Sequence, residues 1–302
     1  MANQMTILDA LKDTSVKRRW ALVVQGGGMR GVYSAGALAC FDHYDLQDCF
    51  DYAVGSSAGA MNAAYFLADQ PGAVNVYTSL LSKKEFVDLT RKRKKIDIDY
   101  MVDVALHEQY PVDTAKLAKA RAELDVVVTD ADDGERIIIR DKKQFGDIYE
   151  QFRATSAMPV LYDRKVPLKQ HFLVDGGVSD LIPIDVAVEN QPTHVIVIMT
   201  RPLKFYTRKS LIKPAVRKLV RKAAKYQSVA IRDMLPTNEL RLAANIRAVE
   251  SKQIGSTHIY ALFPKKEIPV GTATIDRAKL EISAERGWQD ADNFLHLEID
   301  EA

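Results

Sequence analysis

Apolar and polar positions alternate in blocks along the chain, with short apolar runs separated by longer helical patterns. Continuous apolar runs are typical of strands buried on both faces, whereas apolar spacings of three or four residues are typical of helices. The expected strands cover 20–24, 52–54, 125–129, 136–140, 172–174, 195–199 and 258–263. The clearest expected helices cover 32–44 and 58–68. This alternation predicts a layered α/β fold with a mainly parallel sheet.

Two turn signals refine this picture. Asp132-Asp133-Gly134 lies between two expected strands and predicts a hairpin there. Pro71-Gly72 follows the second expected helix and marks its end.

The composition is that of a folded, water-soluble protein. The 302 residues are 47% hydrophobic and 27% charged, which excludes a disordered chain, and the net charge of +2 gives no global reason to expect nucleic acid as a partner. Cys40 and Cys49 show no metal-ligand spacing and are expected to be reduced, as in the cytoplasm. We read no signal peptide, and the apolar runs are far shorter than the ~20 residues that span a bilayer.

Positive charge is concentrated in two segments. Residues Arg91–Lys95 are all basic, and Arg201–Lys225 holds ten Lys or Arg residues and no acidic one. In the second segment, apolar residues recur at helical spacing, and Pro214 favours a helix that begins near it. Such a helix is either a solvated element packed on the body or a surface that attracts anionic lipid headgroups.

A glycine-rich stretch, 26–31, follows the first expected strand and precedes a helix. It reads Gly26-Gly27-Gly28-Met29-Arg30-Gly31. Its G-x-G-x-x-G spacing satisfies the dinucleotide-binding motif, but no acidic residue ends the next strand to hold a ribose. Successive glycines also let backbone N–H groups converge, as an oxyanion hole requires. The second interpretation fits better, and Arg30 then either adds positive charge nearby or points into solvent.

The stretch 53–62, AVGSSAGAMN, places two serines where a strand changes into a helix. Gly55-x-Ser57-x-Gly59 matches G-x-S-x-G, a tight strand-to-helix turn that exposes a serine hydroxyl. Ser57 is midway between the glycines and is the candidate nucleophile. Ser56 is at the variable position and is expected to turn away or to bond locally. The alternative is a flexible turn with no chemical role.

A serine nucleophile needs a base, and here an aspartate is a better candidate than a histidine. No histidine downstream of Ser57 occupies a compelling catalytic loop; these are His107, His171, His194, His258 and His296. Asp175 follows the apolar run 172–174 and precedes Gly176 and Gly177. Functional groups in open α/β sheets collect outside the carboxyl ends of strands, where desolvation would raise the pKa of a carboxyl group toward that of a general base. A purely structural Asp-Gly turn is the alternative.

Taken together, these motifs resemble the patatin-like phospholipase family. Its pattern combines a G-G-G-x-[KR]-G loop, a G-x-S-x-G nucleophile and a D-G-[GA] aspartate, which residues 26–31, 55–59 and 175–177 match in this order. Residues 154–159 resemble a fourth block of the family, which ends in Ala-x-Pro. The resemblance covers about residues 20–200. It implies a three-layer α/β sandwich, with an N-terminal extension at 1–18, a catalytic domain at 19–200 and a C-terminal extension at 201–302 packed on it.

The resemblance also implies roles for individual residues. Ser57 would be the nucleophile, and Asp175 would activate both Ser57 and the deacylating water, with no histidine, metal or cofactor. The oxyanion donors would come from Gly26, Gly27, Gly28 and Met29. The supporting positions would be Arg30, Gly31, Gly55, Gly59, Gly176 and Gly177.

The expected function is hydrolysis of fatty-acyl esters of phospholipids, lysophospholipids or related acyl lipids through an acyl-serine. The alternatives are a nucleotide-binding protein that uses the Gly26–Gly31 loop and a non-catalytic, membrane-associated adaptor on the same fold. We expect an acyl lipid as substrate, no nucleic acid as partner, and peripheral contact with an anionic inner membrane face through Arg201–Lys225. Acyl-chain length, headgroup and oligomeric state stay open.

Overall fold

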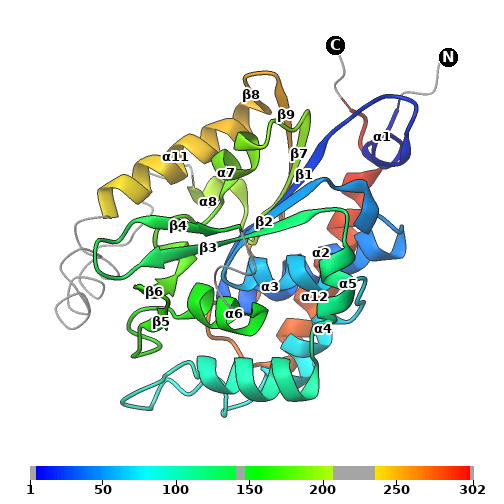
Figure 1. Cartoon of the computed structure of the whole chain (residues 1–302). Helices are drawn as coiled ribbons and strands as arrows, with labels where there is room; N and C mark the ends of the chain where they lie inside the picture. The colour runs from blue at the N-terminus through cyan, green and yellow to red at the C-terminus, as the bar shows by residue number, and fades with distance from the viewer. Residues whose placement is uncertain (1–4, 141–146, 207–234, 300–302) are drawn as a thin grey trace.

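One sheet runs through the part of the chain that the computed structural model describes, residues 5–140, 147–206 and 235–299 (Figure 1). Within these residues it has nine strands in the order β5-β6-β3-β2-β1-β7-β9-β8, with β4 paired to β3. The strands are β1 (Trp20–Val24), β2 (Tyr52–Ser56), β3 (Glu123–Asp130), β4 (Arg136–Ile139), β5 (Val166–Leu168), β6 (His171–Asp175), β7 (His194–Ile198), β8 (Gln253–Ile254) and β9 (Thr257–Leu262). All seven expected strands are present, with ends shifted by at most two residues.

The centre of the sheet is parallel. Strands β3, β2, β1, β7 and β9 run in one direction, and Val23 of β1 lies between Val54 of β2 and Val197 of β7. All five residues of β1 are buried, because helices cover both faces of the sheet. The predicted α/β fold with a mainly parallel central sheet is confirmed.

The helices form two layers, which Figure 1 shows on opposite sides of the sheet. One layer contains α2 (Gly31–His43), α3 (Ala58–Leu67), α6 (Ile148–Ser156) and α12 (Arg277–Leu295). The other contains α7 (Ile184–Glu189), α8 (Leu203–Tyr206) and α11 (Leu235–Ser251). The remaining helical segments are α1 (Ile7–Lys12), α4 (Ala73–Asn75), α5 (Thr114–Lys119), short 3-10 turns at Gly28–Arg30, Gln47–Cys49 and Gly176–Val178, and π-helical segments at Val76–Leu80 and Tyr100–Gln109.

Helix α12 packs closely along α2. A Cβ atom on Gly36 of α2 would lie 2.0 Å from the carbonyl oxygen of Ala284, and one on Gly287 of α12 would lie 2.0 Å from that of Tyr33. The Tyr33 hydroxyl also donates to Asp290 at 2.9 Å. Since α2 begins at the glycine-rich loop, this contact ties the C-terminal helix to the element that carries the expected oxyanion hole.

Strand β6 approaches the sheet from outside its parallel part. Strand β2 ends at Ser56, which pairs with Val127 of β3, and β3 continues beyond this point. Strand β6 pairs antiparallel with the continuation, and its last residue, Asp175, pairs with Val128. Asp175 thus arrives next to the end of β2 although its strand runs the opposite way. Asp175 ends its strand beside the end of β2, as expected, but antiparallel pairing with β3 brings it there, which the sequence did not indicate.

The expected basic segment Arg201–Lys225 lies outside the described residues from position 207 onward. Among the described residues, no helix combines the length and hydrophobicity needed to cross a bilayer.

Candidate active site

Ser57 occupies the turn between β2 and α3. Its φ of 54° and ψ of −128° lie outside the regions that non-glycine residues ordinarily adopt, as is typical of a strained nucleophile turn. The flanking glycines are required by close backbone contacts. A Cβ on Gly55 would lie 2.5 Å from the Ala60 nitrogen, and one on Gly59 would lie 2.1 Å from the Val24 oxygen. The turn is therefore tightly constrained by its surroundings.

Ser57 and Asp175 meet in a buried hydrogen bond. The Ser57 hydroxyl donates to Asp175 Oδ2 at 2.9 Å, and the Gly177 N–H donates to Asp175 Oδ1 at 2.7 Å. The two residues are only 5% and 3% exposed. Burial raises the pKa of the Asp175 carboxyl to about 6, although both hydrogen bonds favour its ionised form. A carboxylate with this pKa is a suitable proton acceptor near neutral pH.

The neighbouring residues fix this pair. The Ser57 N–H donates to Thr155 Oγ1 at 2.8 Å, and the Thr155 hydroxyl donates to the carbonyl of Val127 on β3. Thr155 lies in the expected fourth family block, but its role was not foreseen. A Cβ on Gly176 would lie 2.1 Å from the Val127 oxygen, so only glycine lets the end of β6 approach β3. The buried Ser56 hydroxyl has no hydrogen-bond partner within the described residues, so the local bond expected for Ser56 is not found there.

Only part of the glycine-rich loop has free donors. The Met29 N–H donates to the Thr272 carbonyl at 3.0 Å, and the Gly26 N–H makes a long 3.4 Å bond to the Leu181 carbonyl. Within the described residues, the N–H groups of Gly27 and Gly28 have no such acceptor. Of the four expected donors, only Gly27 and Gly28 therefore keep an N–H group without a backbone acceptor in this part of the chain.

The loop lies against the nucleophile turn. A Cβ on Gly26 would be 2.7 Å from the Ser56 oxygen and 3.2 Å from Ser57 Cβ, and one on Gly31 would be 2.8 Å from Ala58 Cβ. Such close approach is compatible only with glycine at both positions.

The sequence left two alternatives for Arg30, a positive charge near the loop or a side chain that points into solvent. The structure excludes the second. Its Nη1 donates to Thr272 Oγ1 at 2.6 Å, and its buried Nε has no partner within the described residues. Burial and the nearby charge of Arg201 lower the pKa of Arg30 to about 10, so it still carries positive charge at neutral pH. Thr272 thus contacts the loop twice, through its carbonyl to Met29 and through its hydroxyl to Arg30.

The C-terminal part of the chain also holds the loop that follows Asp175. Three side chains of α11 donate to backbone carbonyls there: Asn238 to Val178, Arg241 to Ser179 at 2.8 Å, and Asn245 to Ile182 at 2.8 Å. The acceptors are backbone carbonyls, which every residue type has. No sequence motif therefore predicted these contacts. Residues beyond position 200 therefore support both the aspartate loop and the glycine-rich loop.

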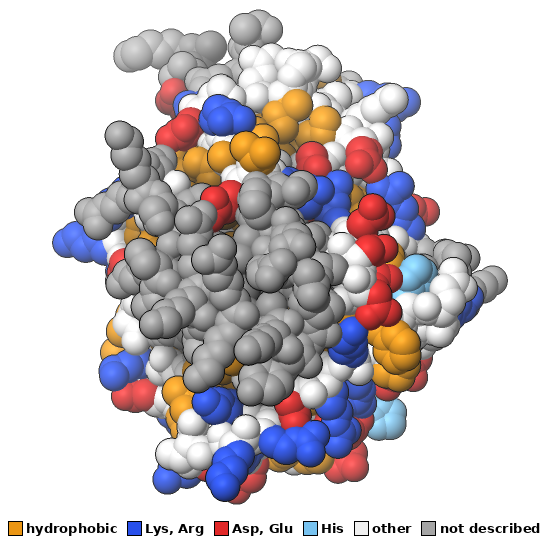
Figure 2. Space-filling model, turned by 90° about the vertical axis from the view of Figure 1, so that its left-hand side faces the viewer, with side chains coloured by type: hydrophobic (Ala, Val, Ile, Leu, Met, Phe, Trp, Pro, Cys, Tyr) orange, Lys and Arg blue, Asp and Glu red, His pale blue; other side chains and the backbone are white. Residues whose placement is uncertain are grey.

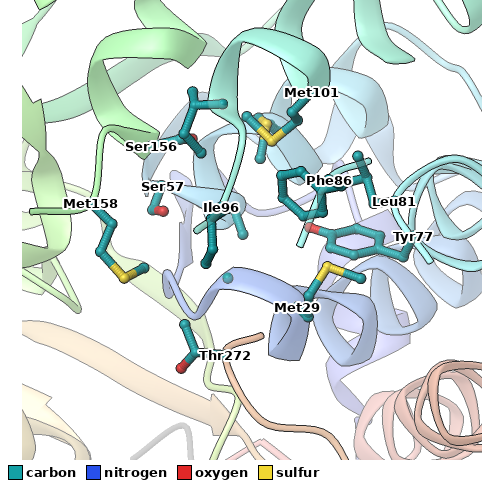
Figure 3. A pocket seen from close by; sticks show the side chains of 14 residues that line it. Met29, Ser57, Tyr77, Leu81, Phe86, Ile96, Met101, Ser156, Met158 and Thr272 are labelled. Atoms are coloured by element: carbon teal, nitrogen blue, oxygen red, sulfur yellow. The ribbon is translucent and has the colours of Figure 1, made fainter. Parts of the chain in front are cut away.

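A narrow apolar pocket, open to solvent on one side, adjoins Ser57 (Figure 3). Figure 3 shows Met29, Tyr77, Phe86 and Ile96 around it, from segments far apart in the sequence. The lining residues are Gly28, Met29, Ser57, Ala58, Met61, Tyr77, Leu81, Phe86, Ile96, Ile98, Met101, Ser156, Met158 and Thr272. The pocket thus places apolar walls directly beside the serine hydroxyl.

The histidines have other partners. His171 Nδ1 lies 2.7 Å from Asp130 Oδ2, and the rings of His194 and His258 stack on neighbouring strands with centroids 5.3 Å apart. His296 Nδ1 lies 2.7 Å from the Asp292 carbonyl. No histidine lines the cavity or hydrogen-bonds Ser57 or Asp175 in the described part of the chain.

Comparisons with known proteins find a matching family and two similar proteins. The model of the family described as patatin-like phospholipase matches residues 22–188, more than half of the chain. Uncharacterized protein YjjU of Escherichia coli (strain K12) is 35% identical over 196 residues, which make up 62% of this chain and 54% of YjjU. The chain thus spans about half the length of this curated relative. The crystal structure of VipD from Legionella pneumophila matches with a TM-score of 0.47 and 14% identity, covering 93% of this chain and 67% of VipD.

The family match begins within β1 and ends within α7, so it contains the glycine-rich loop, the Ser57 turn and the Asp175 loop. The resemblance seen in the sequence is confirmed, and the chain belongs to the patatin-like phospholipase family.

Proposed function

We propose that this protein is a serine lipid acyl hydrolase that cleaves fatty-acyl esters through an acyl-Ser57 intermediate. The observation that carries the proposal is the buried hydrogen bond from Ser57 to Asp175 beside an apolar pocket. Membership of the patatin-like phospholipase family supports the same reaction class.

In the first half of the reaction, Asp175 accepts the proton of the Ser57 hydroxyl as the oxygen attacks the ester carbonyl. The N–H groups of Gly27 and Gly28 stabilise the negative charge on the carbonyl oxygen, and such donors are worth about 3 kcal/mol each in comparable sites. The alcohol then leaves with the proton held by Asp175, and the acyl group stays on Ser57.

In the second half, Asp175 accepts a proton from water, and the resulting hydroxide attacks the acyl-serine. The Ser57 oxygen leaves and regains the proton from Asp175, which restores the enzyme and releases a fatty acid. One carboxylate thus acts twice as a base and twice as an acid, so no histidine is required.

The apolar lining of the cavity favours recognition of the substrate through its aliphatic acyl group. Its lining has no charged side chain, and its walls are mainly Met, Leu, Ile and aromatic residues. Each buried methylene contributes about 0.8 kcal/mol, so chain length should have a large effect on kcat/KM. We propose a phospholipid, a lysophospholipid or a related acyl lipid as the substrate.

Turnover of p-nitrophenyl esters and labelling by a fluorophosphonate probe test this function. Ser57→Ala should abolish both, whereas Ser56→Ala, at the adjacent buried serine, should retain both. Undiminished turnover by Ser57→Ala would refute the proposed nucleophile. Absence of turnover and labelling in the wild-type protein would instead favour a non-catalytic role.

A further inference from the structure

A basic loop, residues 83–95, lies beside the apolar cavity. It connects the π-helical segments Val76–Leu80 and Tyr100–Gln109, and Figure 1 shows it extending from the body at the lower left. An antiparallel bridge between Val87 and Ile96 closes it, with the Asp88 N–H donating to the Lys95 carbonyl at 2.9 Å. Arg91 braces the loop from inside by donating to the carbonyls of Lys84, Glu85 and Lys94.

The two sides of this region differ in chemistry. On the inner side, Phe86, Ile96 and Ile98 are at most 5% exposed and line the cavity that begins at Ser57. On the outer side, Lys83, Lys84, Lys92 and Arg93 are exposed to solvent. The segment that roofs the cavity thus presents positive charge outward.

The outer charge is only partly neutralised. The basic loop contains seven Lys or Arg residues and two acidic ones. Arg93 pairs with Asp163, and Lys94 with Asp97 and Asp99. Within the described residues, no ion pair is found for Lys83, Lys84, Lys92 or Lys95. Figure 2 shows Lys and Arg side chains gathering along the lower edge of this face of the molecule.

An exposed apolar side chain accompanies these charges. Leu89 is 55% exposed on the same loop, two residues before Arg91. Basic side chains bind anionic lipid headgroups, and an exposed leucine can enter the apolar layer beneath them.

We propose that the basic loop is a docking surface for an anionic lipid bilayer. The choice of a bilayer over another polyanion rests on the proposed function, because docking there places the roof of the acyl cavity at the interface that holds the substrate. This surface differs from the Arg201–Lys225 segment expected from the sequence, and it needs no contribution from that segment.

The test uses the full chain carrying Ser57→Ala, so that vesicles are not hydrolysed during the measurement. Flotation with vesicles of phosphatidylglycerol and phosphatidylcholine should show binding that weakens steeply with salt, and vesicles of phosphatidylcholine alone should bind far less. Adding Lys83→Gln, Lys84→Gln and Lys92→Gln should weaken binding about 100-fold, at about fivefold per lysine. The matched control replaces the exposed Lys17, Lys119 and Arg247 by Gln, which removes the same charge elsewhere and should preserve binding.

Leu89→Ser should reduce the binding that persists at high salt, because that residue supplies the apolar part of the contact. Equal binding by the two triple variants would overturn the proposal, as would equal binding to the two kinds of vesicle. Binding to a short DNA duplex without binding to the anionic vesicles would assign the loop to another polyanion instead. Since no step requires turnover, failure of docking is distinguishable from failure of the proposed hydrolase activity.

Discussion

Replacing Asp175 by asparagine tests the proposed base through protein stability as well as activity. Burial raises the pKa of the Asp175 carboxyl from 3.8 to about 6. The folded protein therefore holds this proton more tightly than the unfolded chain does, and the ionised carboxylate destabilises the fold at neutral pH. Asparagine has nearly the same shape and keeps a carbonyl oxygen for the Gly177 N–H. Its amide nitrogen can face Ser57, and it never ionises.

The size of the effect follows from the pKa difference. A shift of about two units corresponds to about 3 kcal/mol. Well below pH 3.8 the carboxyl is protonated in both states, so the variant gains nothing over the wild type. As the pH rises from about 4 to 6, the unfolded chain loses its proton first and the wild type loses stability. We expect Asp175→Asn to be about 3 kcal/mol more stable at about pH 8.

Urea unfolding at about pH 3 and about pH 8 measures these free energies, and ester hydrolysis by the variant at the higher pH should fall by about 10²–10⁴-fold. Asp88→Asn is the control, because hydrogen bonds from Thr90 lower the pKa of the Asp88 carboxyl and its neutralisation should not stabilise the protein. A variant no more stable than the wild type at the higher pH would refute the argument. So would a gain of equal size at both pH values, since that gain could not come from ionisation.

Four further predictions follow from the same geometry. The kcat/KM of the wild type should rise with pH to a plateau, half-complete near pH 6 as Asp175 loses its proton, and a midpoint near pH 4 in the rate profile would contradict the burial argument. Thr272→Val should lower kcat about tenfold with little change in KM by releasing Arg30, while Thr272→Ser keeps the hydroxyl and should retain activity; equal kcat for both variants would reject this positioning role. Phe86→Ala should shift the preference among p-nitrophenyl esters toward longer acyl chains, by about fourfold in kcat/KM per added methylene that is buried, and an unchanged chain-length profile would exclude Phe86 as a wall of the acyl site. Gly36→Ala should destabilise the protein by about 1–3 kcal/mol or more in urea unfolding, whereas Gly271→Ala, with no atom closer than 3.5 Å to the new Cβ, should be nearly neutral; equal stabilities would contradict the tight α2–α12 contact.

The sequence predicted the centre of the fold because the relevant signals are local. The run WALVV of β1 is apolar throughout and is buried on both faces, so its pattern and its environment agree. The sequence also predicted the tight turn around Ser57 from its glycines. Each of these glycines is required by a backbone contact that no larger residue permits. Short strands such as β5 and β8 escaped detection because two or three residues carry no periodicity.

Asp175 shows how a correct position can rest on an incomplete reason. Its apolar strand and following glycines are local features, but its approach to Ser57 depends on how far β3 extends past β2. Strand length relative to a neighbour is a property of pairing, and one sequence does not encode it in any single segment. The same limit applies to the oxyanion donors, because the Thr272 carbonyl that occupies the Met29 N–H lies far along the chain.

The support of the site by the C-terminal part of the chain is the feature that the sequence concealed most completely. The family match ends at residue 188, yet Asn238, Arg241 and Asn245 hold the carbonyls that follow Asp175, and Thr272 holds the loop before α2. Each contact joins a side chain or carbonyl to backbone, so neither partner shows a diagnostic pattern. The geometry of the Ser57–Asp175 pair is therefore coupled to the folding of residues beyond the family domain, and removing those residues should disorder the glycine-rich loop and the loop after Asp175 while leaving every motif of the family intact.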